Sequence, residues 1–234
     1  MKKKSVKSRF KSDIKDHKME IVKDDGSFRH VRFSRPDSLS YSFELTTWPG
    51  YLTISGDMGC WVFCRTPDMF EFFRSDKLTI NNGYWSEKLQ SSSKYEGPEQ
   101  QFSIDAIRDS IKHHLKGCYL TPKIRKAIMR QVEDDVLSMD SEHDIWTALR
   151  DFEYSYSDGS EFNTKEFTFQ DIWELHSTEW SFHYEWCCYA IVWGIQQYDK
   201  HQKKIEKQNA KAVAKINKTL QQSSTIDGIC IGTS

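Results

Sequence analysis

Asp57 lies in the stretch Gly56-Asp57-Met58-Gly59, where an exposed carboxylate could transfer a proton or hold a metal ion. Either task needs a second acidic or basic side chain nearby. No other carboxylate or histidine stands at a spacing from Asp57 that is typical of a catalytic or metal-binding motif. Aspartate also favours turns, because its side chain satisfies local backbone groups. We therefore interpret this stretch as scaffold, in which Gly56, Asp57 and Gly59 specify a turn.

Histidines and cysteines are the other residues that could hold a metal or act as nucleophiles. The candidates are His113, His114, Cys118, His176, His183, Cys60 and Cys64. His114 and Cys118 share a face of a predicted helix, but zinc sites need three or four protein ligands and no matching pair accompanies them. Cys60 and Cys64 are about 13 Å apart on one predicted strand, too far to share an ion. We predict no metal, no cofactor and no catalytic residue, although a cysteine–histidine pair formed on folding stays open.

Charge is distributed unevenly along the 234 residues, although the formal net charge is only −1. Residues 1–18 carry +6 and residues 200–220 carry +6, whereas residues 19–199 carry −12. The acid is densest over residues 133–185, with fifteen Asp/Glu against two basic residues. Such a surface repels nucleic acid and attracts basic partners, whereas lysine-rich ends neutralise phosphates.

This charge pattern predicts a surface that binds a protein partner. We expect it to contain Glu133, Asp134, Asp135, Asp140, Glu142 and Asp144. A second contact is expected on the lysine-rich helix, through Lys203, Lys204, Lys207 and Lys211.

The N-terminal half shows the turns and alternation of an antiparallel sheet. Asp25-Gly26 between two extended runs is a hairpin signal. Pro49-Gly50 fits the centre of a type II turn, because proline fixes φ and glycine accepts a positive φ. With the turn at 56–59, these signals predict about five antiparallel strands between residues 18 and 65.

After residue 101 the apolar residues recur at the spacing of a helix. Ser103 is a plausible N-cap for a helix that ends near Gly117, and Pro122 suits the first position of a second helix over 121–138. A third is expected over roughly 141–152. From Thr168 an apolar stripe predicts a long helix that continues past Tyr198. The predicted fold class is α+β, with an N-terminal antiparallel β-meander packed with a C-terminal helical part that ends in a long helix.

The expected organisation has six parts. They are a flexible basic arm (1–17), a β-meander with a short helix (18–75), a loop or linker (76–101), a helical part packed on the sheet (102–200), a protruding lysine-rich helix (201–222) and a flexible tail (223–234). No window approaches 18 uncharged apolar residues, so no membrane span is expected. The terminal helix could self-associate, which leaves a homo-oligomer open.

Four short strings carry a family resemblance: TWPG at 47–50, GDMG at 56–59, DMFEFFR at 68–74 and WCCYAIVWGIQQYD at 186–199. These strings resemble a family of uncharacterised small proteins encoded by bacteriophages and prophages, and the resemblance extends over most of residues 28–199. The resemblance implies a phage origin and action in the cytoplasm of the infected bacterial host. It implies no catalytic residues.

Three hypotheses for the function follow. The first is a phage accessory protein, not an enzyme, that binds and inhibits a host protein such as an anti-phage defence or nucleic-acid-processing complex, through an acidic surface that mimics nucleic acid. The second is a protein that binds nucleic acid through its basic ends. The third is an enzyme with a site near His30 and Asp57.

Overall fold

The computed structural model describes residues 5–92, 98–157 and 164–227, with the side chains of the last segment up to Asn217. The fold is α+β, as predicted. The chain divides into two compact units. Unit 1 consists of residues 1–97 and 182–234, and unit 2 consists of residues 98–181.

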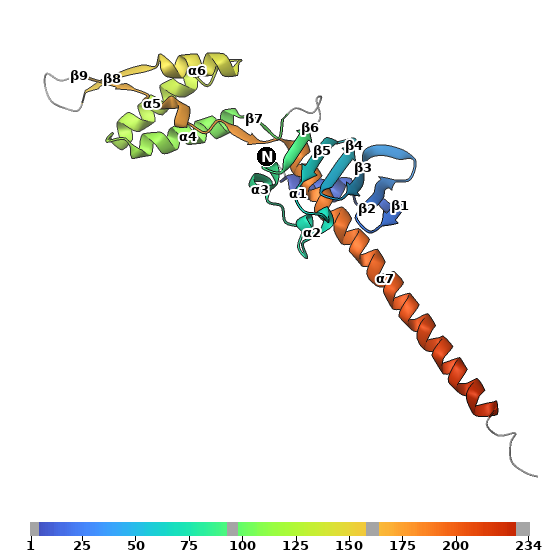
Figure 1. Ribbon diagram of the computed structural model, residues 1–234. Coiled ribbons are helices and arrows are strands. Elements are labelled where there is room, and N and C mark those ends of the chain that lie inside the picture. The colour runs from blue at the N-terminus through green and yellow to red at the C-terminus, as the bar shows by residue number, and fades with distance from the viewer. Residues whose placement is uncertain (1–4, 93–97, 158–163, 228–234) are drawn as a thin grey trace, which may run out of the picture. The chain divides into compact units, whose positions relative to one another are not determined.

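Unit 1 is built on a six-stranded antiparallel sheet whose strands follow one another in chain order (Figure 1). The strands are β1 (Lys18–Asp25), β2 (Phe28–Arg35), β3 (Ser38–Trp48), β4 (Tyr51–Gly56), β5 (Gly59–Cys64) and β6 (Leu89–Ser92). The first five confirm the meander predicted between residues 18 and 65. The segment expected as a loop also contains structure, because β6 extends the sheet and the short helix α3 (Asn82–Ser86) precedes it.

Glycine lies in the predicted turns that connect β1 with β2 and β3 with β4. Gly26 has φ +60° in the β1–β2 hairpin, and Gly50 has φ +87°, which suits the third position of a type II turn. The Gly50 amide donates to the Pro67 carbonyl at 3.1 Å, and the Arg65 amide donates to the Gly50 carbonyl at 3.1 Å. The β3–β4 turn is thereby bound to the segment that follows β5.

One face of the sheet is covered by the first part of α7 (Phe182–Asp227) (Figure 1). Alternate strand residues bury their side chains on one side: Val31, Phe33, Phe43, Leu45, Leu52, Ile54, Trp61 and Phe63. Gly194 permits close approach, since a Cβ there would lie 2.8 Å from Leu45 Cδ1 and 3.1 Å from Phe33 Cε2. The core of unit 1 therefore lies between the sheet and α7.

The expected flexible arm contains a packed helix, α1 (Val6–Asp13), in its described part. Phe10 is fully buried, with its ring edge-to-face to Trp186 at a centroid distance of 5.1 Å. Trp186 Nε1 donates to Asp13 Oδ2 at 3.1 Å. The expectation of a flexible arm rested on the lysines and missed Val6, Phe10 and Ile14, which stand at helical spacing; Phe10 and Ile14 are both buried.

Replacing Phe10 with alanine is expected to lower the free energy of unfolding by about 3 kcal/mol, because it leaves a cavity against Trp186. Urea denaturation of the full chain measures the change. Phe28→Ala is the matched control, since Phe28 is 45% exposed and its loss should cost about 1 kcal/mol or less. Equal effects of the two substitutions would show that α1 is not packed in solution.

Unit 2 is a helical module inserted between β6 and α7. Its elements are β7 (Gln100–Phe102), α4 (Ile104–Gly117), α5 (Pro122–Asp135), α6 (Glu142–Arg150), β8 (Glu153–Ser157), β9 (Thr164–Thr168), the 3-10 helix η1 (Ile172–Glu174) and β10 (Thr178–Trp180). Its core includes Ile107, Ile111, Leu115, Ile128, Val132, Ile145, Leu149, Phe152, Phe167 and Phe169. The entering strand β7 pairs with the leaving strand β10, with Gln100 opposite Trp180.

Each of the helices α4, α5 and α6 begins directly after a serine or threonine that caps it. Ser103 accepts from the Ala106 amide at the start of α4, and Thr121 accepts from the Ile124 amide where Pro122 opens α5. Ser141 caps α6 through the Asp144 amide. The three helices predicted between residues 103 and 152 are therefore confirmed.

The start of the long helix was predicted too early. Residues 168–181 do not continue it, because Asp171 has φ +52°, η1 follows, and β10 pairs with β7. Trp173, which the helix predicted from Thr168 would have included, is 75% exposed. Before it, β8 and β9 form an antiparallel pair in which Tyr154 lies opposite Phe167.

The expected division also differs from the observed units. Of residues 102–200, only those from Phe182 onward belong to unit 1 with the sheet. Beyond the sheet, α7 continues without a break, and its side chains from Lys203 to Asn217 are exposed. Of the expected tail 223–234, residues up to Asp227 belong to α7 and residues 228–234 lie outside the described residues. No helix in the described segments has both the length and the apolar character needed to cross a membrane.

Candidate functional site

Asp57 supports the backbone of the neighbouring strand. Its Oδ2 accepts from the Tyr41 amide at 2.7 Å, and its own amide donates to the Ser42 carbonyl at 3.0 Å. Tyr41 has φ +58°, a conformation that few non-glycine residues adopt without local support. The adjacent Met58 carbonyl accepts from Cys187 Sγ at 3.3 Å. These contacts agree with the interpretation of the turn as scaffold.

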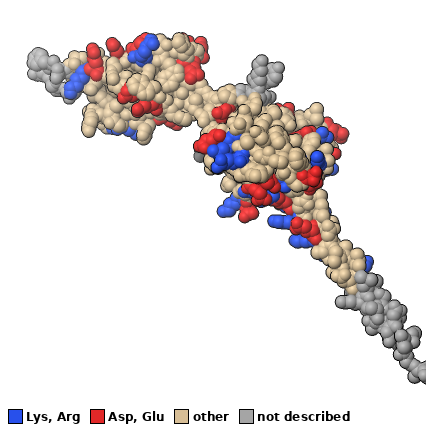
Figure 2. Space-filling model, viewed as in Figure 1, with Lys and Arg blue, Asp and Glu red and all other residues tan. Residues whose placement is uncertain are grey.

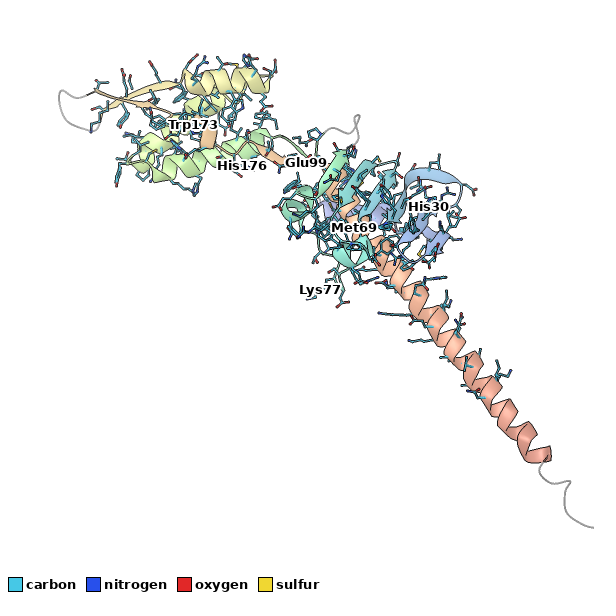
Figure 3. The ribbon with its side chains drawn as sticks, viewed as in Figure 1. His30, Met69, Lys77, Glu99, Trp173 and His176 are labelled. Carbon is cyan, nitrogen blue, oxygen red and sulfur yellow. The ribbon has the colours of Figure 1, made fainter. Side chains whose placement is uncertain are left out.

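His30 does not meet Asp57. It lies on the face of the sheet that α7 leaves open, where its Nε2 is 2.7 Å from Glu44 Oε2 (Figure 3). Arg32 Nε donates to Glu44 Oε1 at 2.8 Å. Burial alone would raise the pKa of Glu44, but the bonds from Arg32 and His30 outweigh it and lower that pKa. His30 pairs with Thr46, four residues along β3 from Ser42, so it lies about 13 Å along the strand from the turn of Asp57.

The remaining histidines and cysteines are scattered. Cys118 Sγ donates to the His114 carbonyl at 3.4 Å, and His176 belongs to unit 2 whereas His183 belongs to unit 1. Cys188 is fully buried, and burial raises the pKa of its thiol far above the ordinary value. Among the described residues no three His, Cys, Asp or Glu side chains are grouped so that they could hold a metal ion.

The strings that carry the family resemblance form one set of contacts inside unit 1. Asp68 receives two bonds of 2.9 Å from Arg29, and its Oδ1 also accepts from the Phe70 amide at the start of α2 (Met69–Phe73). Arg74, just after α2, binds Asp199 of α7 at 2.8 and 3.0 Å. The strings therefore describe how α2 and α7 are held on the sheet. These ion pairs could not be predicted from the sequence, because their partners are 39 and 125 residues apart along the chain.

Unit 2 separates its charges. It contains 17 Asp/Glu and nine Lys/Arg, a formal charge of −8, whereas unit 1 contains 17 Asp/Glu and 24 Lys/Arg, a charge of +7. Five of the nine basic residues lie where α4 ends and α5 begins: Lys112, Lys116, Lys123, Arg125 and Lys126. The six acids predicted to bind a partner lie at the opposite end of α5, in the segment that links α5 to α6 and in the first turn of α6. Figure 2 shows several acidic side chains on the visible face of unit 2.

Two of the six predicted acids have structural contacts. Glu133 is half-buried and accepts from Arg108 Nε at 2.8 Å. Asp144 accepts from Ser141 Oγ at 2.6 Å, within the N-cap of α6.

The other four acids are Asp134, Asp135, Asp140 and Glu142, and all are exposed. Asp134 has only a long contact of 4.0 Å with the exposed Arg130. Glu142 accepts a bond of 3.3 Å from Trp146 Nε1. These four residues, here called the acid quartet, are the part of the predicted surface that is open to a partner.

The lysines predicted as a second contact lie together on α7. One shallow surface along the helix is lined by Lys200, Lys203, Lys204, Lys207, Gln208 and Lys211. All four predicted lysines are exposed, and Lys200 joins them. The structure thus groups the acids in unit 2 and the lysines in unit 1.

Comparison with known proteins adds no relative. The chain matches no family model, no curated protein and no solved structure. Its function is therefore inferred from the charges and contacts of its own residues.

Proposed function

We propose that this chain is a phage-encoded accessory protein that binds and inhibits a host protein, in the cytoplasm of the infected bacterium. The target would be a component of anti-phage defence or of a nucleic-acid-processing complex. The phage origin is supported by the resemblance of the four strings. The binding role is supported by the acid quartet, which is the observation that carries the proposal.

The positions of Asp134 and Asp135 argue against a role in the stability of α5. Asp134 and Asp135 lie in the last turn of α5, where no basic residue accompanies them. A helix C-terminus carries partial negative charge, so a carboxylate there is unfavourable by about 0.3–1 kcal/mol. Residues that oppose the stability of their own helix are typical of binding surfaces, where function is retained at a cost in stability.

The quartet is suited to a basic partner. Four carboxylates within nine residues present a concentrated negative field, which speeds encounter with a positive surface. Proteins that process nucleic acid have such surfaces, because they bind phosphates with lysine and arginine. A folded acidic module could occupy such a channel and exclude the nucleic acid. Inhibition then needs no catalytic residue in this chain.

Neutralising the quartet is expected to abolish inhibition. The variant is Asp134→Asn, Asp135→Asn, Asp140→Asn and Glu142→Gln, which leaves Glu133 and Asp144 in their structural contacts. In hosts that carry defined defence systems, wild-type protein should restore plating of a restricted phage in at least one host. The quartet variant should lower that plating by about tenfold or more, because each tenfold step needs only about 1.4 kcal/mol of binding energy.

The matched control changes the same charge elsewhere in unit 2. Glu153, Glu166, Glu174 and Glu179 are exposed, and replacing each with glutamine should leave inhibition at the wild-type level. The quartet variant should differ from wild type by about 1 kcal/mol or less in urea, because the gain from removing Asp134 and Asp135 at the C-terminus of α5 offsets the loss of Glu142 in the first turn of α6. Full inhibition by a stable quartet variant would rule out the acidic surface as the contact.

A further inference from the structure

The exposed part of α7 has a strongly one-sided charge. At 100° per residue, Lys200, Lys203, Lys204, Lys207 and Lys211 fall within about 100° of the helix circumference. The apolar residues Ile205, Val213 and Ile216 fall on the opposite side, in line with the face that packs on the sheet. The five lysines are here called the lysine face.

The lysine face has little compensating charge on its own helix. Glu206 is the single acid between residues 200 and 217, and Asp199 just before them is bound to Arg74. Lysines spaced three and four residues apart on a helix repel one another. This part of α7 also gains nothing from a core, because its side chains from Lys203 to Asn217 are exposed. A polyanion on this face would remove the repulsion.

We propose that the lysine face binds the phosphate backbone of a nucleic-acid duplex without reading its sequence. Lys200 and Lys211 are about 16 Å apart along the helix axis, and a duplex presents one phosphate charge per about 1.7 Å of its own axis. The duplex therefore offers more than enough charges for five lysines along one straight contact.

The side-chain types fit contact with phosphates rather than with bases. Lysine is a flexible point charge, whereas the bidentate reading of guanine relies on the planar fork of arginine. Residues 200–217 contain no arginine. This surface belongs to unit 1 and does not depend on the acid quartet of unit 2.

The test measures binding of the purified full chain to fluorescent 20-base-pair duplexes of DNA and of RNA. The logarithm of the affinity should fall linearly with the logarithm of the salt concentration, with a slope of about −4, because about four or five phosphates are neutralised. Binding to both duplexes supports backbone recognition. Binding to one of them, if it depends on the lysine face, supports the proposal and identifies the type of duplex.

The decisive variant replaces Lys203, Lys204, Lys207 and Lys211 with glutamine, which has a similar helix propensity. Its slope should shrink to about −1, and its affinity at the lowest salt should drop by about tenfold or more. The control replaces Lys11, Lys15, Lys18 and Lys77, which are also exposed lysines of unit 1. It should bind like wild type, and circular dichroism should show equal helix content in all three proteins.

Four results would overturn the proposal. The first is no binding at 50 mM salt, and the second is an unchanged slope in the decisive variant. The third is salt-sensitive self-association without duplex binding, which would show that the lysine face binds the acidic unit 2 of a second copy. Loss of binding in the control alone would assign the contact to the N-terminal lysines and would equally contradict the proposal.

Discussion

Replacing Gly56 with alanine is expected to lower the free energy of unfolding by about 4 kcal/mol, from backbone strain and overpacking together. Gly56 has φ +150°, a conformation that residues with a side chain rarely adopt. A Cβ at this position would lie 2.2 Å from the Ser42 carbonyl oxygen and 2.7 Å from Phe43 Cα. Both are backbone atoms of β3, so relief would require the sheet itself to shift.

The urea midpoint of the full chain measures this effect. Gly83→Ala is the matched control, because a Cβ at Gly83 in α3 meets nothing within 4 Å. That substitution should change the free energy of unfolding by about 1 kcal/mol or less, and in the stabilising direction if it restricts the unfolded chain. A Gly56→Ala protein as stable as the control would show that the close approach of the β4–β5 turn to β3 is not maintained in solution.

Replacing Asp68 with alanine is expected to cost a similar amount. The guanidinium of Arg29 lies over the Phe70 ring at 4.7 Å, and its side chain is only 10% exposed. Removing Asp68 takes both short bonds from this cation and leaves Asp24 Oδ1 at 3.9 Å from Arg29 Nε, which costs about 3 kcal/mol. It also removes the N-cap of α2, which costs about 1 kcal/mol. Asp199→Ala breaks the more exposed pair with Arg74 and should cost about 1 kcal/mol or less.

The stability of the protein at low pH should depend on the same ion pair between Arg29 and Asp68. Burial alone would raise the pKa of Asp68, but the bonds from Arg29 and from the Phe70 amide outweigh it, so that the pKa is lowered. A carboxylate whose pKa is lower in the folded state contributes stability that is complete above its unfolded pKa of about 3.9 and is lost as the pH falls through the folded value. Wild type should therefore lose stability below about pH 4 more steeply than Asp68→Asn. Parallel acid profiles would contradict the pairing.

Local signals were enough to predict the sheet and most helix starts. Asp25-Gly26 and Pro49-Gly50 fix their own turns, because backbone angles there depend on the residue types alone. Ser103 and Ser141 likewise cap helices through bonds to amides three residues away.

Contacts between residues far apart along the chain could not be predicted from local sequence signals. The start of α7 depends on the pairing of β10 with β7, two three-residue strands separated by 75 residues of chain. Phe169 and Trp173 have a helical spacing, yet Phe169 enters the core of unit 2 and Trp173 is exposed. The spacing of two residues cannot show which core they enter, so the division into two units was not predicted.

The sequence predicted which acids and lysines belong to the candidate site, but not which of them have structural contacts. Proximity along the chain already grouped the acids, and helical spacing already aligned the lysines. The role of Glu133 depended on Arg108, 25 residues away, which only the folded chain shows. Asp144 stands three residues after Ser141, a local pattern of helix capping that the choice of six acids overlooked.

The central claim is that the acid quartet of unit 2 binds a host protein. Tagged wild type, the quartet variant and the four-glutamine control should each be used to capture proteins from nuclease-treated bacterial lysates, followed by quantitative mass spectrometry. One host protein should be recovered in a stoichiometric amount by wild type and control, and depleted by about tenfold or more with the quartet variant. Equal recovery of that protein by the quartet variant would contradict the claim, as would the loss of every partner on nuclease treatment.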